Sequence, residues 1–107
     1  MQVTITARHL HLSSHTTDEF REKIAHIGRF DDHIQYIDVV CSREHDQAQM
    51  EWKIGLAGSK PLVLHTEGDD LKTCVDILMD KAEKALTKNK EIRTKKDHHR
   101  INEALTA

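Results

Sequence analysis

The sequence predicts a small α+β domain with the element order β-α-β-β-β-α, in which a four-stranded sheet has two helices packed on one face. Four short segments alternate apolar with polar residues, the pattern of strands that are buried on one side. Two further segments space their apolar residues three and four positions apart, as amphipathic helices do. The last three strands are separated by short polar turns, which indicates an antiparallel meander. A length of 107 residues suits one domain with one core.

The first half of the chain contains one strand and one helix. Residues 3–8 alternate apolar and polar side chains, so a strand with one buried face is expected there. The two serines at 13–14 are candidate N-caps for a helix that ends between residues 28 and 32, where a glycine and two aspartates weaken it. The apolar stripe of that helix consists of Phe20, Ile24 and Ile27.

Three strands follow in close succession. Residues 34–41 form the first of them, and the polar stretch 42–47 is expected to be a turn. The clearest alternation of the chain runs over residues 49–56, and the segment 57–61, with its glycine and proline, is a second turn. Residues 62–66 complete the sheet.

A long amphipathic helix is expected over residues 69–90, and its polar surface is divided by charge. At about 100° per residue, one broad face is apolar and must pack against the core. The carboxylates of Asp76, Asp80 and Glu83 lie on one flank. The opposite flank carries a lysine stripe only about 60° wide on the same helical wheel. This stripe consists of Lys81, Lys84, Lys88 and Lys95. A one-sided stripe is typical of a helix that contacts phosphates or an acidic partner, and an ordinary solvated face is the alternative.

Charge is distributed unevenly along the chain, although the net value is only −2. Residues 1–80 contain 8 Lys/Arg against 14 Asp/Glu, whereas residues 81–107 contain 8 against 4. A near-neutral total therefore coexists with a basic C-terminal region, and local fields are what steer a charged partner. No segment has the length and apolarity of a membrane span, and the N-terminus lacks the pattern of a signal peptide. A cytoplasmic location is expected.

Metal binding and catalysis are not indicated by the sequence. Cys41 and Cys74 are too few for a disulfide framework and are expected to be buried thiols. The nine histidines raise the question of a metal site, but neither cysteine has a partner at the spacing that zinc sites use. We therefore expect no metal, no cofactor and no enzymatic activity, since no motif supports Cys41 as a nucleophile. Trp52 and Phe20 could stack on bases, but Trp52 alternates in phase with Met50, which favours the core.

The ordered set of residues along the chain resembles the short-form bacterial ribosome hibernation-promoting factors and ribosome-associated inhibitors. The resemblance covers residues 1–95 and rests first on Asp-Leu-Lys-Thr-Cys-Val-Asp-Ile-Leu-Met-Asp-Lys at 70–81. The resemblance continues through Lys84, Leu86, Lys88 and Lys90, which match the Arg-x-Leu-x-Lys-x-Lys pattern that ends the family's domain, with one conservative change. Further support comes from the opening 1–6, from Lys23, and from 32–34 leading into 39–40. Lys72 stands where the family has an aromatic residue.

This resemblance implies a fold like a double-stranded-RNA-binding domain and a role in ribosome hibernation. Members bind the small ribosomal subunit, against 16S rRNA, in the channel for messenger RNA and transfer RNA, and thereby silence translation in stationary phase or stress. Some act with a second small ribosome-dimerising factor. No membrane and no small-molecule substrate is implied. The alternative is a non-enzymatic protein-interaction module that uses the basic helix face to bind an acidic protein.

The residues expected to bind RNA come from both helices. Residues 1–95 are expected to form the ribosome-binding domain and 96–107 a flexible polar tail. The first helix contributes a thin set because His-Thr-Thr at 15–17 replaces the family's Ala-Leu-Arg pattern and removes one expected positive charge. Its candidates are Arg21, Lys23, His26 and Arg29. The second helix contributes Lys72, Lys81, Lys84, Lys88, Lys90, Arg93 and Lys95.

Overall fold

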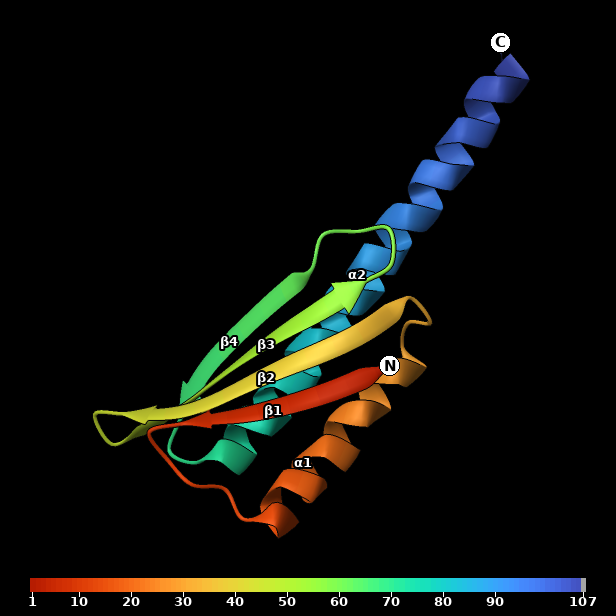
Figure 1. The fold of residues 1–107 in the computed structure, drawn as a ribbon. Helices are drawn as coiled ribbons and strands as arrows, with labels where there is room; N and C mark the ends of the chain where they lie inside the picture. The colour runs from red at the N-terminus through yellow and green to blue at the C-terminus, as the bar shows by residue number, and fades with distance from the viewer. Residues whose placement is uncertain (107) are drawn as a thin grey trace.

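The computed structural model describes the backbone of residues 1–106 and the side chains of residues 1–89. The predicted order of elements is confirmed (Figure 1). The strands are β1 (Gln2–Arg8), β2 (Ile34–Glu44), β3 (Gln47–Leu56) and β4 (Leu62–Gly68), and the helices are α1 (Ser14–Ala25), the short 3₁₀ helix η1 (His26–Arg29) and α2 (Leu71–Thr106).

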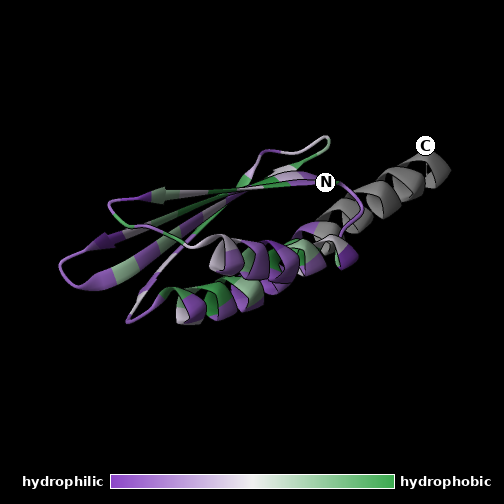
Figure 2. Ribbon diagram, turned by 60° about the horizontal axis from the view of Figure 1, so that its bottom comes forward, coloured by the Kyte–Doolittle hydropathy of each residue, from purple (hydrophilic) through white to green (hydrophobic). Residues whose placement is uncertain are grey.

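The four strands form one mixed sheet in the order β1-β2-β3-β4. β2, β3 and β4 make the expected antiparallel meander, whereas β1 pairs with β2 in parallel. A parallel pair needs a crossover connection, and α1 supplies it. Both helices lie on the same face of the sheet, and the other face has no helix on it (Figure 2). The predicted arrangement of sheet and helices is therefore confirmed.

The hairpin between β2 and β3 is tighter than expected. The sequence predicted a turn over 42–47, but the two strands remain paired as far as Glu44 and Gln47. Only His45 and Asp46 form the turn, and both have positive φ, at 50° and 64°. Two consecutive residues with positive φ match the natural twist of a hairpin, so the polar residues on either side stay in the ladder.

Side-chain caps set the starts of both long helices. The Oγ of Ser13 accepts a hydrogen bond of 3.1 Å from the backbone N–H of Thr16, so Ser13 is the N-cap of α1. The Oδ1 of Asp70 accepts one of 2.7 Å from the N–H of Thr73 at the start of α2. α2 then continues to Thr106, well past the predicted end near residue 90. The side chains of 96–107 lie outside the described residues, and the flexibility of that tail stays a prediction.

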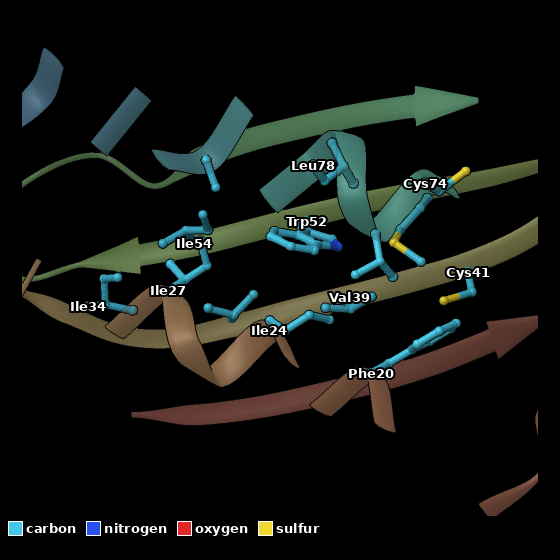
Figure 3. Packing of buried hydrophobic residues seen from close by; sticks show 14 of the residues in the cluster. Phe20, Ile24, Ile27, Ile34, Val39, Cys41, Trp52, Ile54, Cys74 and Leu78 are labelled. Atoms are coloured by element: carbon cyan, nitrogen blue, oxygen red, sulfur yellow. The ribbon is translucent and has the colours of Figure 1, made fainter. Parts of the chain in front are cut away.

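The core lies between the helices and the sheet, with Trp52 of β3 near its centre (Figure 3). Trp52 and Leu78 have no exposed surface, and Phe20 is only 3% exposed. The predicted core role of both aromatic residues is thus confirmed, and neither is available to stack on a base. Cys41 and Cys74 are free, buried thiols, also as predicted. Within the described part of the chain, no helix is long and apolar enough to span a membrane.

Candidate nucleic-acid interface

The described lysines of the α2 stripe are all exposed. Lys81, Lys84 and Lys88 follow one another on the flank of α2 that faces β4, at the spacing of an α-helix. The Nζ of Lys81 donates a hydrogen bond of 3.3 Å to the backbone carbonyl of His65 in β4, which ties the stripe to the edge of the sheet. The side chains of Lys90, Arg93 and Lys95 lie outside the described residues, although their backbone belongs to α2.

The basic residues of the first helical region form a second, separate group. Arg21 and Lys23 lie on α1, and His26 and Arg29 lie on η1; all four are exposed. Two of these cations have carboxylate partners. Arg21 Nη1 lies 3.2 Å from Asp18 Oδ1 one turn earlier. Lys23 forms an ion pair with Asp76 of α2, and this pair joins the two helices.

Lys72 lies apart from the lysine stripe. Nine residues separate it from Lys81, which corresponds to about 180° around an ideal helix. In the fold, Lys72 borders a mainly apolar hollow of about 500 Å³ beside the start of α2. Phe20, Leu71 and Arg43 also line that hollow. Lys72 is therefore exposed, but it does not extend the surface that Lys81, Lys84 and Lys88 form.

Acidic side chains lie between the two groups of cations. Asp76, Asp80 and Glu83 share the outer surface of α2 within about 60° of the helical wheel. Asp76 pairs with Lys23 on the side of α1, and Asp80 Oδ2 lies 3.1 Å from Lys84 Nζ on the side of the stripe. The basic surface of the helices is therefore two bands with carboxylates between them.

The face of the sheet away from the helices carries charges of both signs. Asp38 is the register partner of Lys53, and Glu51 is the register partner of His65. A hollow of about 250 Å³ on this face is lined by both Arg8 and Glu51. Opposite charges at neighbouring positions, such as those of Asp38 and Lys53, cancel over short distances, so this face offers a polyanion no continuous attraction. The helix side is the better candidate for binding RNA.

The pKa values of Cys41, Cys74 and Asp70 are shifted, and none of these residues belongs to the basic surface. Burial, and then the proximity of Cys74, raises the pKa of the Cys41 thiol to about 11. Burial, followed by the charge of Asp70, also raises the pKa of Cys74. The hydrogen bond from the Thr73 backbone lowers the pKa of Asp70. Among the described residues, no three His, Cys, Asp or Glu side chains are placed to hold a metal ion.

Sequence reasoning missed the partners of the cations and one exposed aromatic residue. The pair Asp80–Lys84 has i,i+4 spacing and was readable from the sequence. The pair Lys23–Asp76 spans 53 positions, so no local signal reveals it. Phe30 directly follows Arg29 and is 36% exposed. Its position outside the apolar stripe of the first helix was the available signal.

Relatives with similar sequences match this chain over most of its length. The chain is 30% identical over 91 residues to the ribosome hibernation promoting factor of Azotobacter vinelandii, covering 85% of this chain and 84% of that protein. It is equally similar to the protein of the same name from Pseudomonas putida, where the match covers 85% of this chain and 88% of the relative.

Solved structures share the fold. A ribosomal subunit interface protein from Coxiella burnetii superposes with a TM-score of 0.74 at 24% identity, over 85% of this chain and 99% of that one. The N-terminal domain of Thermus thermophilus Protein Y superposes with a TM-score of 0.73 at 23% identity, over 82% and 98% of the two chains. At these identities the superpositions establish the fold alone.

The family is assigned from a family model that matches residues 3–94. The match covers the sheet, and it includes most of the helical residues that carry the two groups of basic side chains. The resemblance inferred from the sequence is confirmed: the chain belongs to the Sigma 54 modulation protein / S30EA ribosomal protein family.

Proposed function

We propose that this protein binds the small ribosomal subunit and silences translation during stationary phase or stress, as a ribosome hibernation factor of the cytoplasm. The observation that carries this proposal is the exposed lysine stripe of α2 in a chain whose named relatives are ribosome hibernation promoting factors. The names of the relatives point to the ribosome as the partner. The positively charged lysines of the stripe could bind the phosphates of its RNA.

The lysines would act through phosphates rather than through bases. Each Lys or Arg that neutralises a phosphate releases a condensed counterion, so several modest contacts together give useful but salt-sensitive affinity. Phosphate contacts position a protein without reading sequence. In this mechanism, Lys81, Lys84 and Lys88 anchor α2 on 16S rRNA, with Lys90, Arg93 and Lys95 continuing the contact along the helix. The cations of α1 and η1 form the second point of attachment.

Silencing then follows from occupancy alone. With the helices on rRNA, the sheet and its loops fill the path of messenger RNA and transfer RNA, so inhibition is steric and needs no catalytic group or cofactor. The bound ribosomes are kept as inactive single particles or are paired into dimers with a second small ribosome-dimerising factor. The two outcomes differ in the particle that is formed and not in the anchoring surface.

Co-sedimentation with purified small ribosomal subunits tests the proposal. The variant Lys81→Gln/Lys84→Gln/Lys88→Gln should leave the subunit fraction at salt concentrations where the wild type stays bound. Its slope of log K against log salt should also be shallower by about 2 to 3, since each phosphate contact contributes 0.7 to 0.9. The matched control, Arg8→Gln/Lys53→Gln/Lys60→Gln, removes the same charge from exposed positions outside the helices and should bind nearly as wild type.

Two results would contradict the proposal. Co-sedimentation of the triple lysine variant at wild-type affinity would exclude the stripe as the anchor. Capture of a protein partner that persists after ribonuclease treatment, with no binding to small subunits, would instead support the protein-interaction module. Dimeric ribosomes in the gradient, formed only when a second factor is added, would identify the mode of storage.

A further inference from the structure

Two carboxylates of α2 form ion pairs with two of the lysines that the proposed function uses to bind RNA. Asp76 is paired with Lys23 of α1, and Asp80 is paired with Lys84 one turn further along α2. None of these groups is buried: the side chains of Lys23 and Asp76 are 48% and 62% exposed, and those of Lys84 and Asp80 are 77% and 62% exposed. Both pairs therefore lie on the surface that RNA would contact.

The positions of the two aspartates make this more than ordinary surface pairing. On the wheel of α2, Asp76 and Asp80 are about 40° apart and lie between the side facing α1 and the lysine stripe. Asp76 pairs towards the basic residues of α1 and η1, and Asp80 pairs towards the lysine stripe. A strand of RNA that bridges the two bands must cross these carboxylates, and its phosphates would be repelled by them.

We propose that Asp76 and Asp80 set the affinity of the helix surface for ribosomal RNA by competing with phosphates for Lys23 and Lys84. This inference rests on the proposed function and adds a limit to it. In the free protein, each aspartate satisfies a lysine that would otherwise attract any polyanion. On binding, a phosphate takes over the lysine, and the displaced carboxylate remains nearby and repels the backbone.

The size of the effect follows from the exposure of the pairs. Exposed ion pairs are weak, so the carboxylates cannot prevent binding and only reduce it. Weaker binding at Lys23 and Lys84 is useful to a factor that must leave the ribosome when growth resumes. Small losses of binding free energy at each contact add up, and together they raise the rate of dissociation. It also weakens binding to RNA in general, since that binding uses the same charges.

The test measures the affinity and dissociation rate of the full chain on purified small ribosomal subunits. Asp76→Asn and Asp80→Asn keep the shape of the side chain and remove its charge. Each should tighten binding about threefold, and the double variant about tenfold, mainly through slower dissociation. Asp38→Asn is the matched control, because it removes the same charge from an exposed position on the sheet face without helices. It should change the affinity little, and equal tightening by this control would overturn the inference.

A double-mutant cycle separates competition for one lysine from general repulsion. Lys84→Gln should weaken binding more in the Asp80→Asn background than in the wild type, because the lysine is then free for phosphate. Equal losses in both backgrounds would show that Asp80 acts only through its overall charge and would overturn the inference. Thermal unfolding of each variant checks that the fold is retained.

The two proposals fail in different ways. If the wild type does not bind small subunits, the proposed function fails. If the wild type binds, the triple lysine variant does not, and Asp76→Asn/Asp80→Asn binds no more tightly than wild type, only the inference about the aspartates fails.

Discussion

The ring of Tyr36 in β2 lies directly over Gly55 in β3. The two residues are register partners, and a Cβ added at position 55 would lie only 2.0 Å from Cε1 of Tyr36. The register shifts between Ile34 and Tyr36, and Gly55 is buried although it has no side chain. The aromatic ring thus covers the strand at a position where only a hydrogen atom fits.

Replacement of Gly55 should therefore destabilise the sheet. Gly55→Ala places a methyl group inside the Tyr36 ring, so the ring or the strands must move, at a cost of about 1 to 3 kcal/mol in the free energy of unfolding. Urea unfolding at equilibrium measures this change. The variant Tyr36→Ala/Gly55→Ala should lose less than the sum of the two single changes, because the clash is absent. An unfolding midpoint of Gly55→Ala equal to that of the wild type would show that the ring does not lie over the glycine.

Leu78 should be one of the costliest truncations in α2. Its side chain has no exposed surface and packs in the cluster that surrounds Trp52 (Figure 3). Leu78→Ala leaves a cavity and should cost about 2 to 5 kcal/mol in the free energy of unfolding. Thr87→Ala, at an exposed position of the same helix, is the control and should change it by less than about 0.5 kcal/mol. Similar losses for the two variants would contradict the described packing of α2.

The cap of α2 should stabilise the protein most at pH values where Asp70 is ionised. The pKa of Asp70 is lowered from 3.8 in the folded chain, chiefly by the hydrogen bond from the Thr73 backbone. A lowered folded-state pKa gives stabilisation that is fully present above the unfolded value and is lost as pH falls through the folded value. The difference in melting temperature between wild type and Asp70→Ala should thus be largest near neutrality and shrink below pH 3.8. Thr87→Ala, at an exposed position of α2 without a titratable side chain, should show no such trend.

Both cysteines should be protected from alkylation in the native protein. Burial raises the pKa of the Cys41 thiol to about 11, and the thiolate is the reactive form. Iodoacetamide at pH 8 should therefore label neither Cys41 nor Cys74 appreciably until urea unfolds the chain. Mass spectrometry of the labelled peptides measures the rates, with the variant Lys60→Cys, at an exposed position, as the accessible reference. Labelling of native Cys41 at the rate of that reference would contradict its buried position.

Lys72 and Lys88 should contribute unequally to ribosome binding. Lys88 belongs to the lysine stripe, whereas Lys72 lies roughly opposite Lys81 on α2 and borders the apolar hollow. Lys88→Gln should reduce the affinity for small subunits about three- to fivefold and make the salt slope shallower by almost one unit, and Lys72→Gln should do less of both. A larger loss for Lys72→Gln would place the RNA on the α1 side of the helix.

The elements of the fold were predictable because their signals are local. The alternation over residues 49–56 and the spacing of Phe20, Ile24 and Ile27 depend only on neighbouring positions, and the structure buries these residues as expected, down to the placement of Trp52. The lysine stripe was readable for the same reason, since helical spacing alone puts Lys81, Lys84 and Lys88 on one flank. The family resemblance rested on this same linear order of residues.

Boundaries were less predictable because local and tertiary effects compete there. The residues 42–47 are polar and were expected to turn, yet pairing of Glu44 with Gln47 leaves only His45 and Asp46 in the turn. Helix propensity alone did not extend α2 beyond residue 90. In each case the ladder or the helix continues as long as its backbone hydrogen bonds are satisfied, whatever the polarity of the side chains.

By itself, the sequence determined which segments become strands and helices, which faces are buried and where positive charge gathers along α2, since all of these follow from the periodicity of one segment at a time. The tertiary structure decided the parallel pairing of β1 with β2, the seat of the Tyr36 ring on Gly55 and the ion pair between Lys23 and Asp76. Those contacts join residues far apart in the chain, so they depend on how the elements pack together. The periodicity of α2 puts its carboxylates beside the lysine stripe, and the packing of α1 against α2 brings a second group of cations to their other side.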